Sequence, residues 1–234
     1  MKKSYFSAMF FLVIVLFQNF KTYDIAFDPK YYVKEQTRLQ HAKEVLGKKY
    51  SRSIAAQVEG QTILGVEVLN IVSRNLPKKN QSKADKIAKA IIEESNKYDI
   101  DPIFVASVIK TESSFNHLAV GTSGEIGLMQ LMPNTGEYIA KRIKLKFNGA
   151  KTLRDPVKNI KIGVAYIHYL RTKFGNDAKK YIPAYNMGPG KFKKAFASGE
   201  RPVIYGNKIL KFYEQFYKKI YVSQMFMKPN LAAN

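Results

Sequence analysis

The sequence predicts a mainly α-helical domain preceded by a helical extension. Apolar residues recur every three or four positions along several segments, which is the spacing of amphipathic helices. Asp-Pro pairs at 101–102 and 155–156 supply the N-cap and first-turn proline of two of these helices. With 234 residues, of which 46% are hydrophobic, the chain is long enough to bury one core.

Residues 1–22 have the features of a targeting segment. Lys2 and Lys3 precede an apolar run from Tyr5 to Phe17, as in the charged and hydrophobic regions of an export signal. The run is shorter than the roughly 20 residues that span a bilayer, and no small-x-small cleavage pattern follows it. Two interpretations stay open: a cleaved signal peptide, or an uncleaved inner-membrane anchor formed by residues 5–20, with a buried core helix as a third alternative. Both leading interpretations place the protein in the cell envelope or periplasm.

The sequence of residues 23–80 predicts a helical extension, with a linker at 76–83. The stretches 30–50 and 58–76 have helix-compatible spacing, and we expect the extension to pack on the domain or to space it from the membrane. No catalytic chemistry is visible in it. Its expected buried positions are Val45, Leu46, Ile63, Val66, Leu69 and Ile71.

The main domain is expected at 81–222. Ser82 is predicted to cap its first helix, with Asp85 in the capping-box position and an end near Asp99. A second helix begins at Pro102, and its apolar stripe continues through Val108 to Glu112.

Three more helices are expected further along. One runs from Pro156 to Gly175, one ends at Asn186 before two glycines, and the last runs from about 205 to 221. Residues 223–234 are expected to form a tail.

Glu112 is the candidate catalytic acid. Partial burial and the negative end of the helix dipole both disfavour its carboxylate, so we expect a raised pKa. A glutamic acid still protonated near neutral pH can donate a proton to a leaving oxygen. The alternative is a solvated residue at the frayed end of a helix.

A glycine-rich segment at 121–127 follows, as expected of a tight loop that lines a cleft. Gln130 offers an amide donor and acceptor, and Met132 offers an apolar contact for a sugar ring. Tyr185, at a glycine-terminated helix end, is placed to bring a hydroxyl to the same site. The alternatives are a core segment for 127–133 and simple packing for Tyr185.

Several site classes are excluded or disfavoured. The chain has no Cys, which excludes disulfides and thiolate metal sites, and its three His lack metal-ligand spacing, so we expect neither metal nor cofactor. No GK[ST] pattern follows the glycines, which argues against phosphate cradling. The formal charge of +21 favours polyanionic surroundings, but the lysines are scattered and form no nucleic-acid-binding motif, so we expect no nucleic-acid partner.

Three segments in order resemble the signatures of the soluble lytic transglycosylase (SLT) family. They are ESSF at 112–115, GLMQLMPNT at 127–135 and AYNMGPG at 184–190, and the resemblance covers about 82–221. It implies a lysozyme-like catalytic domain, related to goose-type lysozyme, with a cleft for peptidoglycan glycan strands. It also implies Glu112 as the single catalytic acid and base. The substrate-binding residues that we expect beside it are Ser113, Gln130, Met132, Tyr185 and Asn186.

The resemblance implies cleavage without water. Glu112 would protonate the oxygen between N-acetylmuramic acid and N-acetylglucosamine and then take the 6-hydroxyl proton, closing a 1,6-anhydro ring. An ordinary glycosidase needs a second carboxylate, and the sequence offers none in a catalytic pattern, Glu125 included. The alternatives are a goose-type muramidase that uses water and a non-catalytic cell-wall-binding protein. We expect a monomer.

The chain departs from the family pattern at two places. Many relatives carry Ser where this chain has Gly121, and a hydroxyl there would have to come from Thr122 or Ser123. Some relatives carry Glu within the segment equivalent to 204–210, where this chain has no acidic residue.

Overall fold

The computed structural model describes residues 28–60 and 64–227. These residues form helices, with only isolated antiparallel bridges at Val120–Ile126 and Ile126–Leu131. The prediction of a mainly α fold with an N-terminal helical part is confirmed. The targeting segment expected at 1–22 lies outside the described residues. None of the helices in the described ranges is long and apolar enough to cross a membrane.

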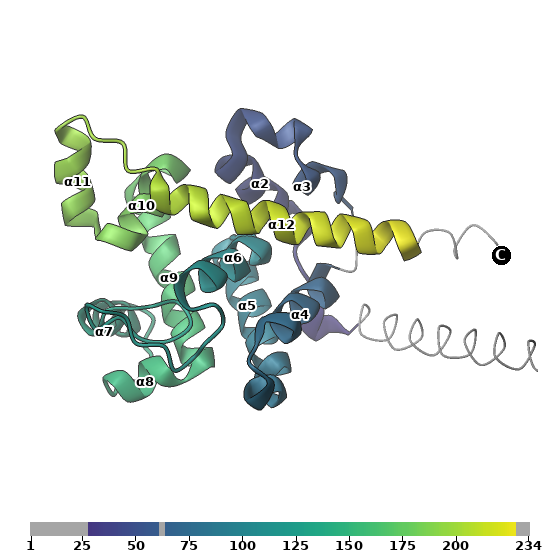
Figure 1. Ribbon diagram of the computed structural model, residues 1–234. Coiled ribbons are helices and arrows are strands. Elements are labelled where there is room, and N and C mark those ends of the chain that lie inside the picture. Colours follow the sequence, from purple (N-terminus) through teal and green to yellow (C-terminus); the bar gives the residue numbers. More distant parts are fainter. Residues whose placement is uncertain (1–27, 61–63, 228–234) are drawn as a thin grey trace, which may run out of the picture.

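Four helices form the centre of the domain: α5 (Ala84–Tyr98), α6 (Pro102–Ser113), α9 (Pro156–Lys173) and α12 (Ile204–Met227). The long helix α12 crosses α6, and α5 packs along α9 (Figure 1). Every residue of α6 from Pro102 to Ile109 is buried, as expected of a helix that is apolar on all sides. Glu112 therefore stands at the end of the central helix, where that helix leaves the core.

The N-terminal extension packs on this core. Its elements are η1 (Pro29–Tyr31), α2 (Glu35–Leu46), η2 (Gly47–Arg52), α3 (Ile54–Gln57) and α4 (Leu64–Asn75). Helix α4 contacts α5 and α6, while α3 contacts α12.

A buried arginine ties the extension to the last helix. Arg38 is fully buried and donates to the Tyr217 hydroxyl at 3.1 Å, and it also pairs with Glu35 at 2.6 Å. Removing one partner of such a pair would leave an uncompensated charge in the interior. Of the expected core positions in the extension, Val66 and Ile71 are buried. Val45, Leu46 and Leu69 are partly buried against the core, and Ile63 lies outside the described residues.

The expected cap of the first domain helix is wrong. Ser82 belongs to a 3-10 helix, η3 (Lys78–Lys83), and α5 begins after it at Ala84 without a side-chain cap. Asp85 forms no capping box. Its carboxylate instead accepts a hydrogen bond from the hydroxyl of Tyr31 in the extension. The segment 76–83 is packed, with Leu76 and Asn80 buried, because the extension lies against the domain at this point.

The other two expected caps are confirmed. Asp101 accepts from the Ile103 amide at 2.8 Å, and Asp155 accepts from the Lys158 amide at 3.0 Å. The last helix is longer than expected, because α12 continues to Met227. The remaining helices are α7 (Pro133–Arg142), α8 (Ala150–Arg154), α10 (Ala178–Met187) and α11 (Pro189–Ala197).

Candidate active site

Glu112 lies in the last turn of α6 and is partly buried. The helix ends in two left-handed residues, Ser114 with φ 50° and Phe115 with φ 66°. A bulky residue at positive φ is uncommon and needs support from its surroundings. Phe115 has that support because its ring is fully buried in the core. The turn after Glu112 is thus held by packing, and it fixes where the helix ends.

The surroundings of Glu112 raise its pKa from the ordinary value of 4.5 to about 7. Burial, which disfavours the carboxylate, is the main cause, and the negative charge of Glu125 adds to it. A hydrogen bond from Tyr205 acts in the opposite direction because it stabilises the carboxylate. A substantial fraction of Glu112 is therefore protonated near neutral pH, as a general acid requires.

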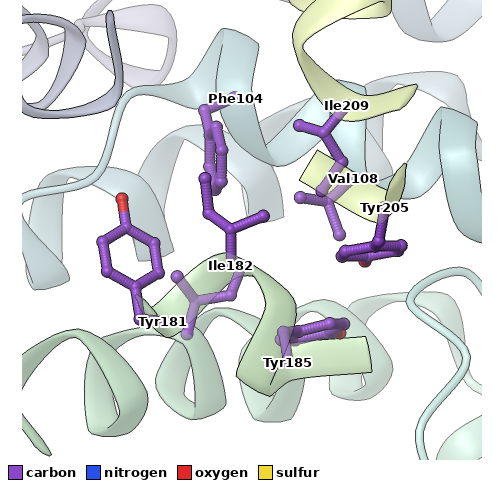
Figure 2. Close-up of a pocket in the computed structure, with 8 residues that line it drawn as sticks. Phe104, Val108, Tyr181, Ile182, Tyr185, Tyr205 and Ile209 are labelled. Carbon is purple, nitrogen blue, oxygen red and sulfur yellow. The ribbon is translucent and has the colours of Figure 1, made fainter. Parts of the chain in front are cut away.

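Two stacked tyrosines cover the inner side of the acid. The Tyr205 hydroxyl donates to Oε1 of Glu112. The ring of Tyr205 lies 6.5 Å from that of Tyr185, at an interplanar angle of 8°, and the Tyr185 hydroxyl donates to the Met129 carbonyl at 2.8 Å. Tyr185, from the third signature segment, thus lies beside Glu112's hydrogen-bond partner, as Figure 2 shows for the two rings.

An apolar wall lies behind these two rings. It encloses a cavity of about 10 Å³, far too small for a sugar, so substrate cannot bind there. The residues that line it with Tyr185 and Tyr205 are Phe104, Val108, Ile167, Tyr181, Ile182 and Ile209 (Figure 2).

The glycine-rich loop is fixed by one buried side chain. Asn159 of α9 is fully buried, and its Oδ1 accepts from the Met129 amide at 2.8 Å. Its Nδ2 donates to the carbonyls of Ile126 at 2.9 Å and Leu153 at 2.8 Å. Gly127 is required at this contact, since a Cβ there would lie 2.3 Å from the Leu153 carbonyl oxygen, and its φ is +86°. The loop is therefore a rigid wall of the site.

Gln130 and Ser113 both hold this loop. The Gln130 amide donates to the carbonyls of Ala119 at 3.2 Å and Gly127 at 2.9 Å, with Gln130 itself at φ 44°. The Ser113 hydroxyl donates to the Leu128 carbonyl at 2.8 Å, which joins the end of α6 to the loop. The N–H and O–H donors of these two side chains are thus used within the protein. Their oxygens remain as hydrogen-bond acceptors for a ligand.

Met132 and Asn186 are on the outer side of the site. Met132, the N-cap residue of α7, is 40% exposed, and Asn186 is exposed near the end of α10. Asn186 shares a groove of about 210 Å³ with Tyr205 and Lys208. Four large apolar residues that follow Glu112 in the sequence are also exposed, two before the loop's turn and two just before or at the start of α12: Leu118, Val120, Val203 and Ile204.

A carboxylate occupies the space above Gly121. A Cβ at Gly121 would lie 2.3 Å from Oε2 of Glu125 and 2.9 Å from Oε1 of Gln130. The Glu125 carboxylate is held there by the Ser123 amide at 3.1 Å. Thr122 and Ser123, the two expected sources of a hydroxyl, are exposed. The Glu125 carboxylate therefore fills the space that a side chain at position 121 would need.

Sequence reasoning missed three residues of this site. Tyr205 lies one turn before Ile209 on the core face of α12, and that spacing was the available signal. Asn159 follows the Asp155 cap by four positions and looks like an ordinary helical polar residue. Glu125 lies in a glycine-rich stretch where only the three-dimensional turn brings it back over Gly121.

The three histidines lie in separate places. His41 is buried and its Nε2 lies 3.1 Å from the Tyr181 hydroxyl, while His117 is buried beside Lys83 at 2.8 Å. His168 stacks on Tyr98 with ring centres 5.0 Å apart. Within the described ranges, no three His, Asp or Glu side chains are grouped as metal ligands.

Comparisons with known proteins place the chain in one family. The family model of the transglycosylase SLT domain matches residues 89–205. Membrane-bound lytic murein transglycosylase C of Histophilus somni is 35% identical over 147 residues, which are 58% of this chain and 40% of that protein. Soluble lytic murein transglycosylase of Salmonella typhimurium is 33% identical over 96 residues, 41% of this chain and 15% of that protein. This chain thus spans about two fifths of the first of these relatives.

Among solved structures, the 70 kDa soluble lytic transglycosylase of Escherichia coli aligns with a TM-score of 0.48 and 22% identity. That alignment covers 76% of this chain and 32% of the other.

Proposed function

Because this chain belongs to the transglycosylase SLT domain family, we propose that it is a lytic transglycosylase that cleaves peptidoglycan. The bond is that between N-acetylmuramic acid and N-acetylglucosamine, and the product ends in 1,6-anhydro-N-acetylmuramic acid. The observation that carries the proposal is Glu112, a partly buried acid with a pKa of about 7 between the loop and the tyrosines. The names of the murein transglycosylases that the chain resembles support the same activity.

Glu112 acts twice in the proposed mechanism. Its proton passes to the glycosidic oxygen as the bond from that oxygen to C1 of the muramyl sugar breaks, and the muramyl N-acetyl group stabilises the positive charge that develops. The carboxylate so formed then takes the proton of the 6-hydroxyl while O6 bonds to C1. The net result is that one proton moves from O6 to the leaving oxygen, so no water is consumed.

Tyr205 stabilises the state between the two proton transfers, in which Glu112 is a carboxylate. Its hydroxyl donates to Glu112, and hydrogen bonds to a charged acceptor are stronger than those to a neutral one. The bond is therefore worth most when Glu112 has lost its proton. Tyr185 stacks on Tyr205 and Asn186 shares a groove with Tyr205, which supports their assignment to the lining of the substrate site. We assign Ser113, Gln130 and Met132 to the same lining because Ser113 joins the loop that carries them to the end of α6.

A second candidate is a muramidase that uses water. One observation favours it: the Glu125 carboxylate lies over Gly121 on the loop and is near enough to raise the pKa of Glu112. A second carboxylate on the opposite side of a sugar, about 6.5 to 9.5 Å from the acid, activates water in inverting glycosidases. The two candidates differ in their product, since the anhydro product is lighter by one water.

The proposed setting is the bacterial cell envelope. The formal charge of +21 would draw the protein to anionic wall polymers and lipid headgroups, and the attraction weakens with salt. We further propose that residues 1–22 direct the export of the chain. They are then either cleaved off as a signal peptide or kept as an anchor in the inner membrane.

Mass spectrometry of the fragments released from purified sacculi tests the proposal. The native chain should release anhydro-ended fragments, and Glu112→Gln should release none while keeping the helical circular dichroism spectrum of the native chain. Fragments with an added water would establish the second candidate. Cleavage by a folded Glu112→Gln protein would refute both.

A further inference from the structure

The two helices that carry Glu112 and Tyr205 are joined by hydrogen bonds at two places. At one of them, the Tyr205 hydroxyl of α12 donates to Glu112 in the last turn of α6. At the other, Asp101 at the start of α6 accepts from the hydroxyls of Tyr213 at 2.5 Å and Tyr217 at 2.7 Å, both of α12. The two helices therefore run in broadly opposite directions, and a second bonded contact lies at the far end of α6 from the acid.

The spacing of the two contacts is similar on both helices. At a rise of about 1.5 Å per residue, Asp101 and Glu112 lie about 16 Å apart along α6. By the same rise, Tyr205 lies about 12 Å from Tyr213 and about 18 Å from Tyr217 along α12. The Asp101 contact therefore limits how far α12 can slide along α6, and with it the position of Tyr205 beside Glu112.

Apolar side chains pack closely between the two contacts. Phe104 and Val108 of α6 and Ile209 of α12 leave a cavity of only about 10 Å³ (Figure 2). The ring centre of Phe104 also lies 6.3 Å from that of Tyr213. A close-packed interface transmits strain, because its side chains have little space in which to absorb it. A shift of α12 at Tyr213 should therefore reach Tyr205.

Arg38 of the N-terminal extension strengthens the second contact. Its Nη1 donates to the Tyr217 hydroxyl and to the Ala55 carbonyl, each at 3.1 Å, while Nε and Nη2 donate to Glu35. Arg38 and Asp101 are both fully buried. Burial raises the pKa of Asp101, and the charge of Arg38 acts in the opposite direction. Arg38 therefore favours the carboxylate, which is the form that accepts from both tyrosine hydroxyls.

We propose that Tyr213 and Tyr217 are positioning residues, because their bonds to Asp101 fix α12 along α6. The Tyr205 hydroxyl is thereby kept on Glu112, where it stabilises the carboxylate. The inference rests on the proposed function for the role of Glu112. The match to the family model ends at Tyr205, so both positioning residues lie beyond it.

The test measures the pKa of Glu112 directly and needs no substrate. Glutamate side-chain carboxyl carbons are labelled with ¹³C and titrated by NMR in the full chain, and the Glu112 signal is identified by its absence in Glu112→Gln. Tyr217→Phe removes one bond to Asp101, and Tyr213→Phe with Tyr217→Phe removes both; neither changes the net charge. The matched control is Tyr31→Phe, which removes a bond from another buried tyrosine to a carboxylate, that of Asp85 on α5.

Losing both hydroxyls should raise the pKa of Glu112 by about half a unit or more, towards the full unit expected when Tyr205 has no hydroxyl. Tyr217→Phe alone should raise it by a smaller amount that NMR resolves, and it decides the matter if the double variant does not fold. Neither should add to the rise in a Tyr205→Phe background, because no hydroxyl is left to displace. Tyr31→Phe should lower the stability in urea without moving the pKa.

An unchanged or lower pKa of Glu112 in the folded variants would overturn the inference, and so would an equal rise in the Tyr205→Phe background. The descending limb of kcat/KM against pH, measured on glycan strands, should move together with the pKa. If the native chain cleaved no strand, the proposed function would fail, while the NMR titration would still decide about Tyr213 and Tyr217.

Discussion

The carboxylate of Glu112 accepts a hydrogen bond from the hydroxyl of Tyr205, a residue 93 positions later in the chain. The bond joins the end of the central helix α6 to the first turn of α12, and it stabilises the carboxylate form of the acid. Burial and the charge of Glu125 stabilise the protonated form. The acidity of Glu112 is thus set by opposing influences, and two of them, the Tyr205 hydrogen bond and the Glu125 charge, can each be removed by a single substitution.

We expect Tyr205→Phe to raise the pKa of Glu112. Activity depends on protonated Glu112 and declines as pH rises through its pKa, so the descending limb of kcat/KM against pH should move upward by about one pH unit. The profile is measured with solubilised glycan strands. Tyr221→Phe, which removes a hydroxyl from the same helix far from the acid, should leave the limb in place. A limb that stays in place or moves downward for Tyr205→Phe would contradict the assigned role of the bond.

We expect the opposite shift for Glu125→Gln. The negative charge of Glu125 raises the pKa of Glu112, so its removal should lower that pKa and move the descending limb to lower pH. The shift should shrink with added salt, because exposed parts of the charge pair are screened. Glu137→Gln, an exposed charge change on α7, is the control. If Glu125→Gln instead abolished cleavage at every pH, the water-using candidate would gain support.

Glu112 should destabilise the folded protein above neutral pH. Its pKa rises on folding from 4.5 to about 7, so the stability present below pH 4.5 declines as pH rises and is lost by about pH 7. Glu112→Gln carries no charge at this position at any pH, so it should be more stable than the native chain at pH 8 by about 3 kcal/mol. The two should be similar at pH 4. Urea unfolding at both pH values gives the comparison, and equal stabilities at pH 8 would show that Glu112 is not desolvated.

Asn159→Ala should loosen the loop that carries Gln130. The substitution removes three buried hydrogen bonds and leaves the Met129 amide and the Leu153 carbonyl without these partners, while the Ile126 carbonyl keeps the Leu131 amide. This should cost about 3 kcal/mol of stability. Thermal unfolding measures that loss, and amide hydrogen exchange at 126–131 should quicken beyond the change elsewhere. Asn134→Ala, an exposed position on α7, should behave like the native chain. Unchanged exchange at 126–131 would show that the loop does not depend on Asn159.

The local expectations succeeded where short-range chemistry decides the outcome. Asp101 and Asp155 cap their helices because an Asp-Pro pair sets both the side-chain acceptor and the first φ angle. The expectation that Ser82 caps a helix was wrong. Ser82 has a suitable residue type and spacing, but residues 78–83 form a 3-10 helix where the extension packs on the domain. Asp85 accepts a hydrogen bond from Tyr31 and forms no capping box. A cap is a local preference, and a tertiary contact can override it.

The sequence alone determined that the chain is helical, that Glu112 stands at the end of an apolar helix, and that three ordered segments belong to one family. Periodicity, capping and motif order are properties of neighbouring residues, so they can be read without a structure. Only the tertiary structure decided the pKa of the acid, its partner Tyr205, the position of Glu125 over Gly121 and the support from Asn159. These depend on distances between residues far apart in the chain, and burial and electrostatic interaction follow those distances.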